Sequence, residues 1–202
     1  SVAITVIARL LIGWLCDRIG PRLAYTWLLI IGSLPVMAIG LATDAWTFIF
    51  LRLLIGMIGA SFVITQYHTS IMFAPNVVGT ANATSAGWGN LGGGVTQLVM
   101  PVVFAGVTGI FGLSAAWGWR LSMFLAGLTC LLTGVAYFMF TQDAPEGNFK
   151  DLRLAGKLPS REKSNGAFKA ACKDYRVWAL FVVYGVCFGI ELTINNVLAL
   201  YF

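Results

Sequence analysis

Long apolar runs separated by short polar turns dominate the sequence. A membrane-spanning helix needs about 20 mostly apolar residues, because each residue adds about 1.5 Å and the hydrocarbon layer is about 30 Å thick. Both ends of the chain fall inside apolar runs, so we expect it to be a fragment of a longer protein. The pattern predicts six membrane helices, of which the first is short, at residues 1–16, 23–42, 46–73, 78–107, 119–140 and 177–202.

The composition agrees with this pattern. The 202 residues are 58% hydrophobic and only 10% charged, whereas soluble domains carry about 25% charged residues. We therefore predict an all-α, polytopic membrane protein. The net charge of +5 does not indicate nucleic-acid binding, because eight of the 13 Lys and Arg residues lie in one polar stretch. The four cysteines form no CxxC pair, so we expect no metal site, and the three that fall in apolar segments are predicted to be small packing residues.

That polar stretch, residues 141–176, divides the chain. It contains Pro145, Gly147, Gly156, Pro159 and Gly166, a composition typical of a linker rather than of a folded domain. We expect residues 1–140 to belong to one helical half and residues 177–202 to begin another. Basic loops face the cytoplasm, so residues 141–176 are predicted to be cytoplasmic. Alternation of the helices then places the turn at residues 17–22 on the same side.

Arg9 is predicted to lie deep in the membrane. It precedes Asp17, at the membrane edge, by about 12 Å of helix, and half the hydrocarbon thickness is about 15 Å. An arginine near the midplane is costly and is by default a functional hypothesis. Its guanidinium has a planar fork of donors that suits an oxyanion. The alternative is a structural arginine paired with a carbonyl or an acid.

The segment at residues 78–107 contains five glycines in eight residues, Gly87 to Gly94, around Asn90. Glycines let membrane helices approach closely, and an amide can donate to an anion without adding charge. We expect this segment both to pack against other helices and to face a pathway. One helical stripe contains Gly87, Asn90, Gly94, Gln97 and Pro101.

Two other segments carry polar groups. Arg52, Gly56, Gly59, Val63, Gln66 and Ser70 have helical spacing and are predicted to share a face. Gln66 either faces a path or bonds to another helix, and His68, the only histidine, either packs or carries a proton. In residues 177–202 one stripe contains Tyr184, Phe188, Glu191 and Asn195. Glu191 either exchanges a proton or pairs with a neighbour.

Several stretches resemble known transporters. Residues 13–22, GWLCDRIGPR, resemble the loop signature between helices 2 and 3 of the major facilitator superfamily. Residues 86–97, AGWGNLGGGVTQ, resemble the nitrate signature of its nitrate/nitrite porter family. The Arg9 segment, Gln66-Tyr67, residues 141–148 and residues 189–196 resemble the high-affinity nitrate transporters of plants and algae. The resemblance covers nearly the whole chain.

This resemblance implies a partial twelve-helix fold in which the six segments are helices 2 to 7. By position, Arg9 matches the arginine that binds nitrate, and Asn90 matches the asparagine beside it. A second substrate arginine belongs to helix 8, beyond residue 202. The remaining site residues that the resemblance suggests are Gly87, Phe62, Tyr184 and Phe188 for the substrate, and Asp17, Arg18 and Arg22 for gating.

The implied function is transport of nitrate, with nitrite as a further candidate substrate, together with protons, by alternating access and without a cofactor. Glu191 is the candidate for proton coupling. The implied partners are the anion, protons, the lipid bilayer, which we expect to be the plasma membrane, and an accessory membrane protein. A nitrate/nitrite exchanger and a nitrate-sensing receptor remain alternatives. An enzyme is disfavoured, because neither a cluster of metal ligands nor a Ser/His/Asp set can be assembled.

Overall fold

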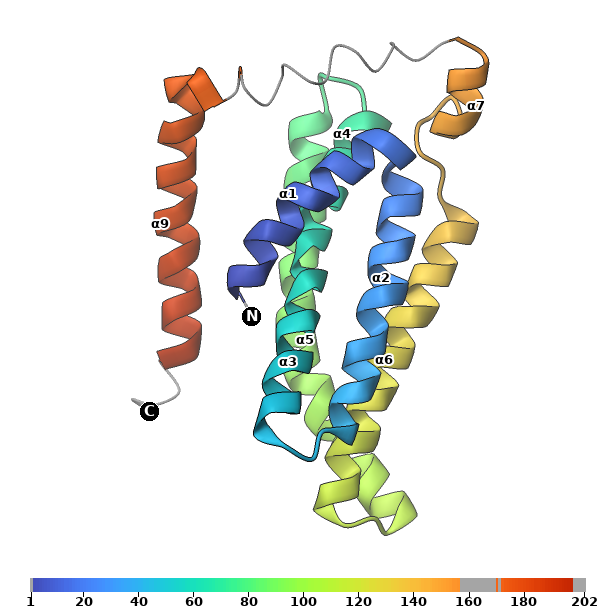
Figure 1. Ribbon diagram of the computed structural model, residues 1–202, viewed down its shortest axis with the longest axis vertical. Helices are drawn as coiled ribbons and strands as arrows, with labels where there is room; N and C mark the ends of the chain where they lie inside the picture. The colour runs from blue at the N-terminus through green and yellow to red at the C-terminus, as the bar shows by residue number, and fades with distance from the viewer. Residues whose placement is uncertain (1, 157–169, 171, 198–202) are drawn as a thin grey trace. The chain divides into compact units, whose positions relative to one another are not determined.

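The computed structural model describes residues 2–156, 170 and 172–197. The chain forms two compact units, Ser1–Ala155 and Gly156–Phe202, and no strand occurs among the described residues. The first unit contains α1 (Val2–Ile19), α2 (Pro21–Ala38), η1 (Ile39–Leu41), α3 (Ala45–Ile55), η2 (Gly56–Ala60), α4 (Ser61–Met72), α5 (Val78–Phe111), α6 (Ala115–Phe140) and α7 (Phe149–Leu154), where η marks a 3-10 helix; the second contains α9 (Tyr175–Val197) (Figure 1).

Four helical stretches in the described residues are long and apolar enough to cross a membrane. α1 falls outside this set, since it carries Arg9, Asp17 and Arg18, and the apolar part of α9 is shorter. Together with the absence of strands from the described ranges, these helices confirm the predicted all-α, polytopic class. The four stretches are Pro21–Leu41, Ala45–Met72, Val78–Phe111 and Ala115–Phe140.

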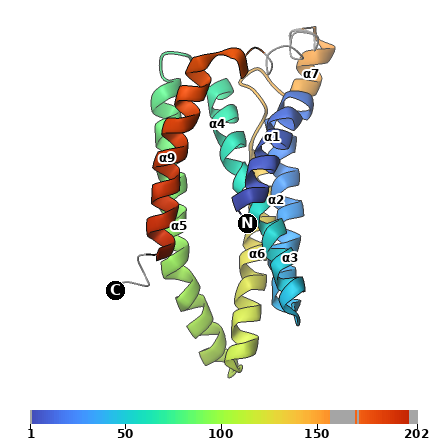
Figure 2. The same cartoon turned by 60° about the vertical axis from the view of Figure 1, so that its left-hand side comes forward.

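α2 and α6 lie side by side along most of their length (Figures 1 and 2). Gly127 and Gly134 of α6 are buried in this contact. A Cβ added at Gly127 would lie 2.9 Å from the backbone nitrogen of Met37, and one at Gly134 would lie 3.0 Å from the Cβ of Leu29. Glycine therefore permits the close approach of the two backbones.

η2 interrupts the segment for which we predicted one continuous helix, residues 46–73. A 3-10 helix has 3.0 residues per turn instead of 3.6, so its five residues rotate the following helix by about 100°. The face predicted to run from Arg52 to Gln66 is therefore broken, and that prediction was wrong. η2 packs on α1, where the Thr5 hydroxyl donates to the Gly56 carbonyl at 2.7 Å.

A small core holds α1, α2 and α4 together. Because Arg9 follows the buried Ala8, it turns about 100° away from this core along the helix. Core packing thus fixes the direction in which Arg9 leaves α1. The core consists of Ala8, Ile12, Cys16, Ala24, Leu28, Ala60 and Ile64.

α5 and α6 extend beyond the predicted limits and meet at a tight turn. Gly112 adopts φ +60° there, a conformation that glycine accepts readily. Away from this turn the two helices diverge (Figure 2). The glycines from Gly87 to Gly94 show no close packing within the described part of the chain, since an added Cβ at any of them would meet nothing within 4 Å.

The polar stretch at residues 141–176 begins with a folded portion. Ala144 and Gly147 exchange backbone hydrogen bonds of 3.1 and 3.0 Å, and α7 follows. This portion, to Ala155, belongs to the first unit, whereas we expected a linker throughout. The rest of the polar stretch contains four basic residues that lie outside the described residues, Lys157, Arg161, Lys163 and Lys169.

Candidate functional site

Arg9 and Phe62 meet between α1 and α4. The guanidinium carbon of half-buried Arg9 lies 5.7 Å from the centre of the Phe62 ring, within the range of a cation–π contact. The two helices run in the same direction, because Thr5 contacts Gly56 and Gly59 one turn earlier. The structure therefore brings together two of the predicted site residues.

The contact between α4 and α5 sets the depth of Asn90. Asn82 donates from its amide to the Ser70 hydroxyl at 2.9 Å, which pairs these antiparallel helices. Phe62 on α4 and Asn90 on α5 each lie two turns, or about 12 Å, from this pair. Asn90 is thus level with Phe62 along the helix axes.

The structure does not, however, bring Asn90 or Gly87 into contact with Arg9. Both residues are exposed on α5. The described part of the first unit therefore presents a cation against an aromatic ring, with an open amide at the same depth. Such an arrangement has the chemistry to bind a small anion, because the guanidinium supplies a positive charge and the amide supplies an uncharged donor.

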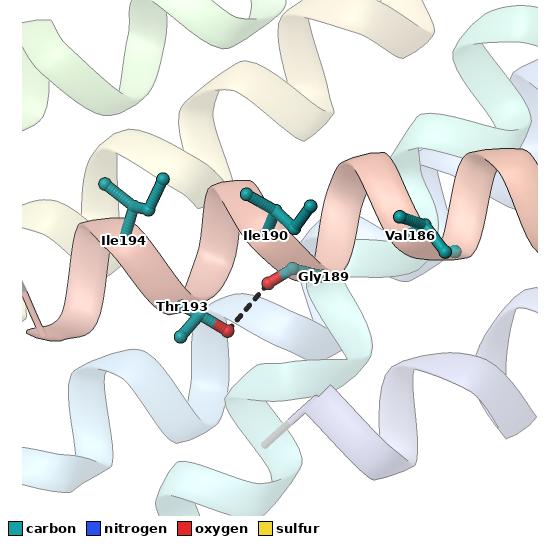
Figure 3. A pocket seen from close by; sticks show the side chains of 6 residues that line it. Val186, Gly189, Ile190, Thr193 and Ile194 are labelled. Carbon is teal, nitrogen blue, oxygen red and sulfur yellow. Dashed lines mark hydrogen bonds between the residues drawn. The ribbon is translucent and has the colours of Figure 1, made fainter.

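Tyr184 and Phe188 stack on one face of α9, with ring centres 5.6 Å apart and planes 8° apart. The opposite face is a shallow apolar groove, in which the Thr193 hydroxyl turns back to the Gly189 carbonyl at 2.8 Å (Figure 3). The Glu191 side chain, predicted on the face of Tyr184 and Phe188, lies outside the described residues. The groove is formed by Gly185, Val186, Gly189, Ile190, Thr193 and Ile194.

The predicted gating residue Arg22 binds within the first unit. Its guanidinium donates to the Phe138 carbonyl, from Nε at 2.9 Å and from Nη2 at 2.5 Å, and to the Asn148 side chain at 3.1 Å. Its ring-face contact is also with Phe138, at 4.2 Å. Arg22 therefore ties the start of α2 to the end of α6.

Asp143 is the acid that completes this junction. Its carboxylate accepts the Arg22 backbone N–H at 2.9 Å and the Phe149 backbone N–H at 3.0 Å, and only 3% of the residue is exposed. These donors belong to the first turns of α2 and α7. Since the residue before α2 is Gly20, which has no side chain, Asp143 supplies the cap that the local sequence lacks.

Arg153 of α7 secures the end of α1. Its guanidinium donates to the Asp17 carbonyl at 2.9 Å and to the Arg18 carbonyl at 2.7 Å. The side chains of Asp17 and Arg18 are themselves exposed, and Arg18 lies over the Trp14 ring at 3.7 Å. Arg153 therefore contacts these two predicted gating residues through their backbone carbonyls.

His68 is buried between α4 and the end of α6. One ring nitrogen, Nδ1, pairs with the Tyr137 hydroxyl, and Nε2 lies 2.8 Å from the Gln142 carbonyl. A carbonyl only accepts, so Nε2 donates this hydrogen bond to Gln142. This arrangement supports the packing role that the sequence left as one of two alternatives.

Sequence reasoning missed Asp143 and Arg153 as functional neighbours of the gating turn. Two features of the sequence could have indicated Asp143. It is an acid that directly follows an apolar segment, and the helix that starts at Gly20-Pro21 has no capping side chain of its own. Arg153 gave no signal beyond its charge. Within the described residues no group of His, Cys, Asp or Glu could hold a metal ion.

Comparison with known proteins adds a family. The model of the Major Facilitator Superfamily matches residues 1–202. The chain is 40% identical over 204 residues to "High affinity nitrate transporter 2.5" of Arabidopsis thaliana, covering 100% of this chain and 40% of that protein. It is 35% identical over 204 residues to "Nitrate transporter 2.1" of Chlamydomonas reinhardtii, covering 100% of this chain and 37% of that protein.

A cyanobacterial protein is also similar. "Nitrate/nitrite transporter NrtP" of Nostoc punctiforme is 32% identical over 194 residues, covering 95% of this chain and 36% of that protein. The chain thus spans about two fifths of the length of the curated relatives that it matches. No solved structure matches it.

Proposed function

Because the chain belongs to the Major Facilitator Superfamily, we propose that it is part of an integral membrane transporter that carries nitrate, and also nitrite, by alternating access. Relatives named as nitrate transporters support the choice of substrate. Residues 1–140 contribute to one helical half of that transporter, residues 141–176 connect the halves, and residues 177–202 begin the second.

Arg9 is the observation on which this proposal depends. It is a cation in an apolar helix, held against the Phe62 ring at the depth of Asn90. The guanidinium fork can donate two parallel hydrogen bonds to two oxygens of a planar anion. Tyr184 and Phe188, which stack on α9, are the further substrate residues of the proposal.

The anion drives closure in this mechanism. A second cation, from the half beyond residue 202, faces Arg9 and repels it while the site is empty. An anion between them removes the repulsion, so the halves close around an occupied site. Midplane sites between repeats that rock against each other are general in secondary transporters.

Protons supply the driving force in this proposal. Moving one negative charge inward against a negative interior costs about 2.3 kcal/mol per 100 mV, so the membrane potential drives entry only when more than one proton accompanies each nitrate. We assign Glu191 as the coupling residue and the plasma membrane as the location. Residues 141–176 face the cytoplasm, and an accessory membrane protein is a further proposed partner.

Uptake of labelled nitrate by the full-length protein tests the site. Arg9→Lys keeps the charge but loses the fork, so the KM for nitrate should rise by about tenfold or more. Arg9→Ala should abolish uptake, since the Phe62 ring alone offers no donor. Surface expression of each variant must equal that of the wild type.

Arg52→Lys is the matched control, because Arg52 is an exposed arginine in another apolar helix, α3. We expect its KM for nitrate to stay within about twofold of the wild-type value. Unchanged KM values in both Arg9 variants would eliminate Arg9 as the anion ligand.

A further inference from the structure

One side chain on the helix that carries Phe62 has an unmet hydrogen bond. The amide nitrogen Nε2 of Gln66, on α4, is buried and finds no hydrogen-bond partner among the described residues. A buried donor left unsatisfied costs about 1–3 kcal/mol. A ligand that accepts from this N–H would remove that cost.

The direction of α4 carries the Gln66 amide toward Arg9. Gln66 follows Phe62 by one turn, so the two share a helix face. Side chains of a helix lean toward its N-terminus, which places the amide over the turn that contains Phe62. That turn is the one against which the Arg9 guanidinium lies.

The neighbouring turn of α1 presents a residue without a side chain at the level of this amide. Because α1 and α4 run in the same direction, Gly13, one turn after Arg9, is the α1 residue at the level of Gln66. A Cβ added at Gly13 would meet nothing within 4 Å. The position next to Gly13 on α1 is therefore open at the level of Gln66.

The chemistry of the two candidate anions differs in one atom. Nitrate is planar with three oxygens, whereas nitrite has two. A guanidinium fork satisfies two oxygens, and the third oxygen of nitrate then needs a donor that adds no charge. A primary amide supplies such a donor.

We propose that Gln66 donates a hydrogen bond to the third oxygen of nitrate and so determines the preference of the site for nitrate over nitrite. This inference rests on the proposed function. Gln66 is then a specificity-determining residue, whereas Arg9 binds either anion.

The competing explanation is a partner in the contact between α4 and α5. Asn82 Oδ1 and Ser85 Oγ are also buried there without hydrogen-bond partners in the described ranges, so a water molecule bridging them to Gln66 would satisfy the same N–H. Such a role would affect folding and both anions equally. The selectivity between anions therefore distinguishes the two explanations.

The full-length protein, purified and reconstituted in liposomes, allows the KM to be measured for labelled nitrate and for nitrite. Gln66→Met keeps the length and bulk of the side chain and removes its donors. We expect the KM for nitrate to rise about tenfold, and the KM for nitrite to stay within about twofold. Thr65→Val, a change at the neighbouring position of α4, where the hydroxyl donates to the Ser61 carbonyl of the same helix at 3.0 Å, should leave both values unchanged.

A second variant, Gln66→Asn, withdraws the amide by one methylene and should cause the same selective loss, of about threefold. An equal rise for both anions, or no rise for nitrate in either variant, would overturn the proposal. Arg9→Lys, measured in parallel, separates the two levels of the argument. If the nitrate KM is unchanged in Arg9→Lys as well as in the Gln66 variants, the proposed site itself is wrong. If the nitrate KM rises in Arg9→Lys but not in the Gln66 variants, only the role of Gln66 is rejected.

Discussion

Asp143 shows how a single side chain can serve two helix ends. Its two carboxylate oxygens accept from the first turns of α2 and α7, where helix dipoles favour negative charge. Arg22 and Arg153 complement it, because each donates to carbonyls at a helix end, those of α6 and α1. Four helix ends are thereby neutralised at one junction.

Replacing Asp143 by Asn should destabilise this junction. Asparagine offers one acceptor oxygen and turns an NH₂ group toward an N–H, so a buried donor loses its partner at a cost of about 1–3 kcal/mol. We expect the apparent Tm of the full-length protein in detergent to fall by several degrees. Asp151→Asn is the control, since Asp151 is an exposed acid in the first turn of α7.

The control should shift the Tm by no more than about 1 °C. A similar Tm for both variants would show that the buried carboxylate adds nothing to stability. Sequence alone could not reveal the bond between Arg22 and Asp143, because these two residues lie 121 positions apart and no periodicity connects them.

At the level of elements, hydropathy predicted the helices well and their interruptions poorly. Length and apolarity fix where a helix crosses a membrane, so the segments expected at residues 23–42, 78–107 and 119–140 all occur. η2 was missed because Gly56 to Ala60 are as apolar as the flanking residues. Their first carbonyl, that of Gly56, accepts from Thr5 on another helix, a contact that apolarity does not indicate.

Close packing of α2 on α6 leads to a second prediction. Gly127→Ala places a methyl group 2.9 Å from the Met37 backbone nitrogen and 3.1 Å from the Ser33 carbonyl, and backbone atoms cannot yield cheaply. We expect overpacking to cost about 1–3 kcal/mol, seen as a lower Tm. Val135→Ile also enlarges α6, but at an exposed position, and should leave the Tm unchanged; equal effects would argue against this contact.

At the level of the whole molecule, the chain holds part of the proposed site. Arg9, Phe62 and Asn90 were predictable in kind from depth and motif resemblance. Their mutual arrangement required the register of α4 on α5, set by Ser70 and Asn82. Gln66 needed the structure most, since its buried N–H is apparent only from the surrounding packing.

Energy coupling is the prediction that belongs to this scale. In liposomes that contain the full-length protein, an inward proton gradient should drive nitrate accumulation without any internal anion. Glu191→Gln removes a titrating group, so we expect a flattened pH dependence with transport down a nitrate gradient retained. Uptake that ignores the proton gradient but requires internal nitrite would instead identify an exchanger.

The double cap by Asp143 also has a consequence for biosynthesis. Ribosomes add about 5–20 residues per second, and Asp143 follows Arg22 by 121 residues. The Asp143 carboxylate, which accepts from the first turn of α2, is therefore synthesised about 6–24 s after that turn. During that interval the α1–α2 hairpin exposes an uncapped N-terminus and Gly20 at φ +93°. Nascent chains arrested before residue 143 should accordingly be more sensitive to protease at this turn than chains arrested after residue 155.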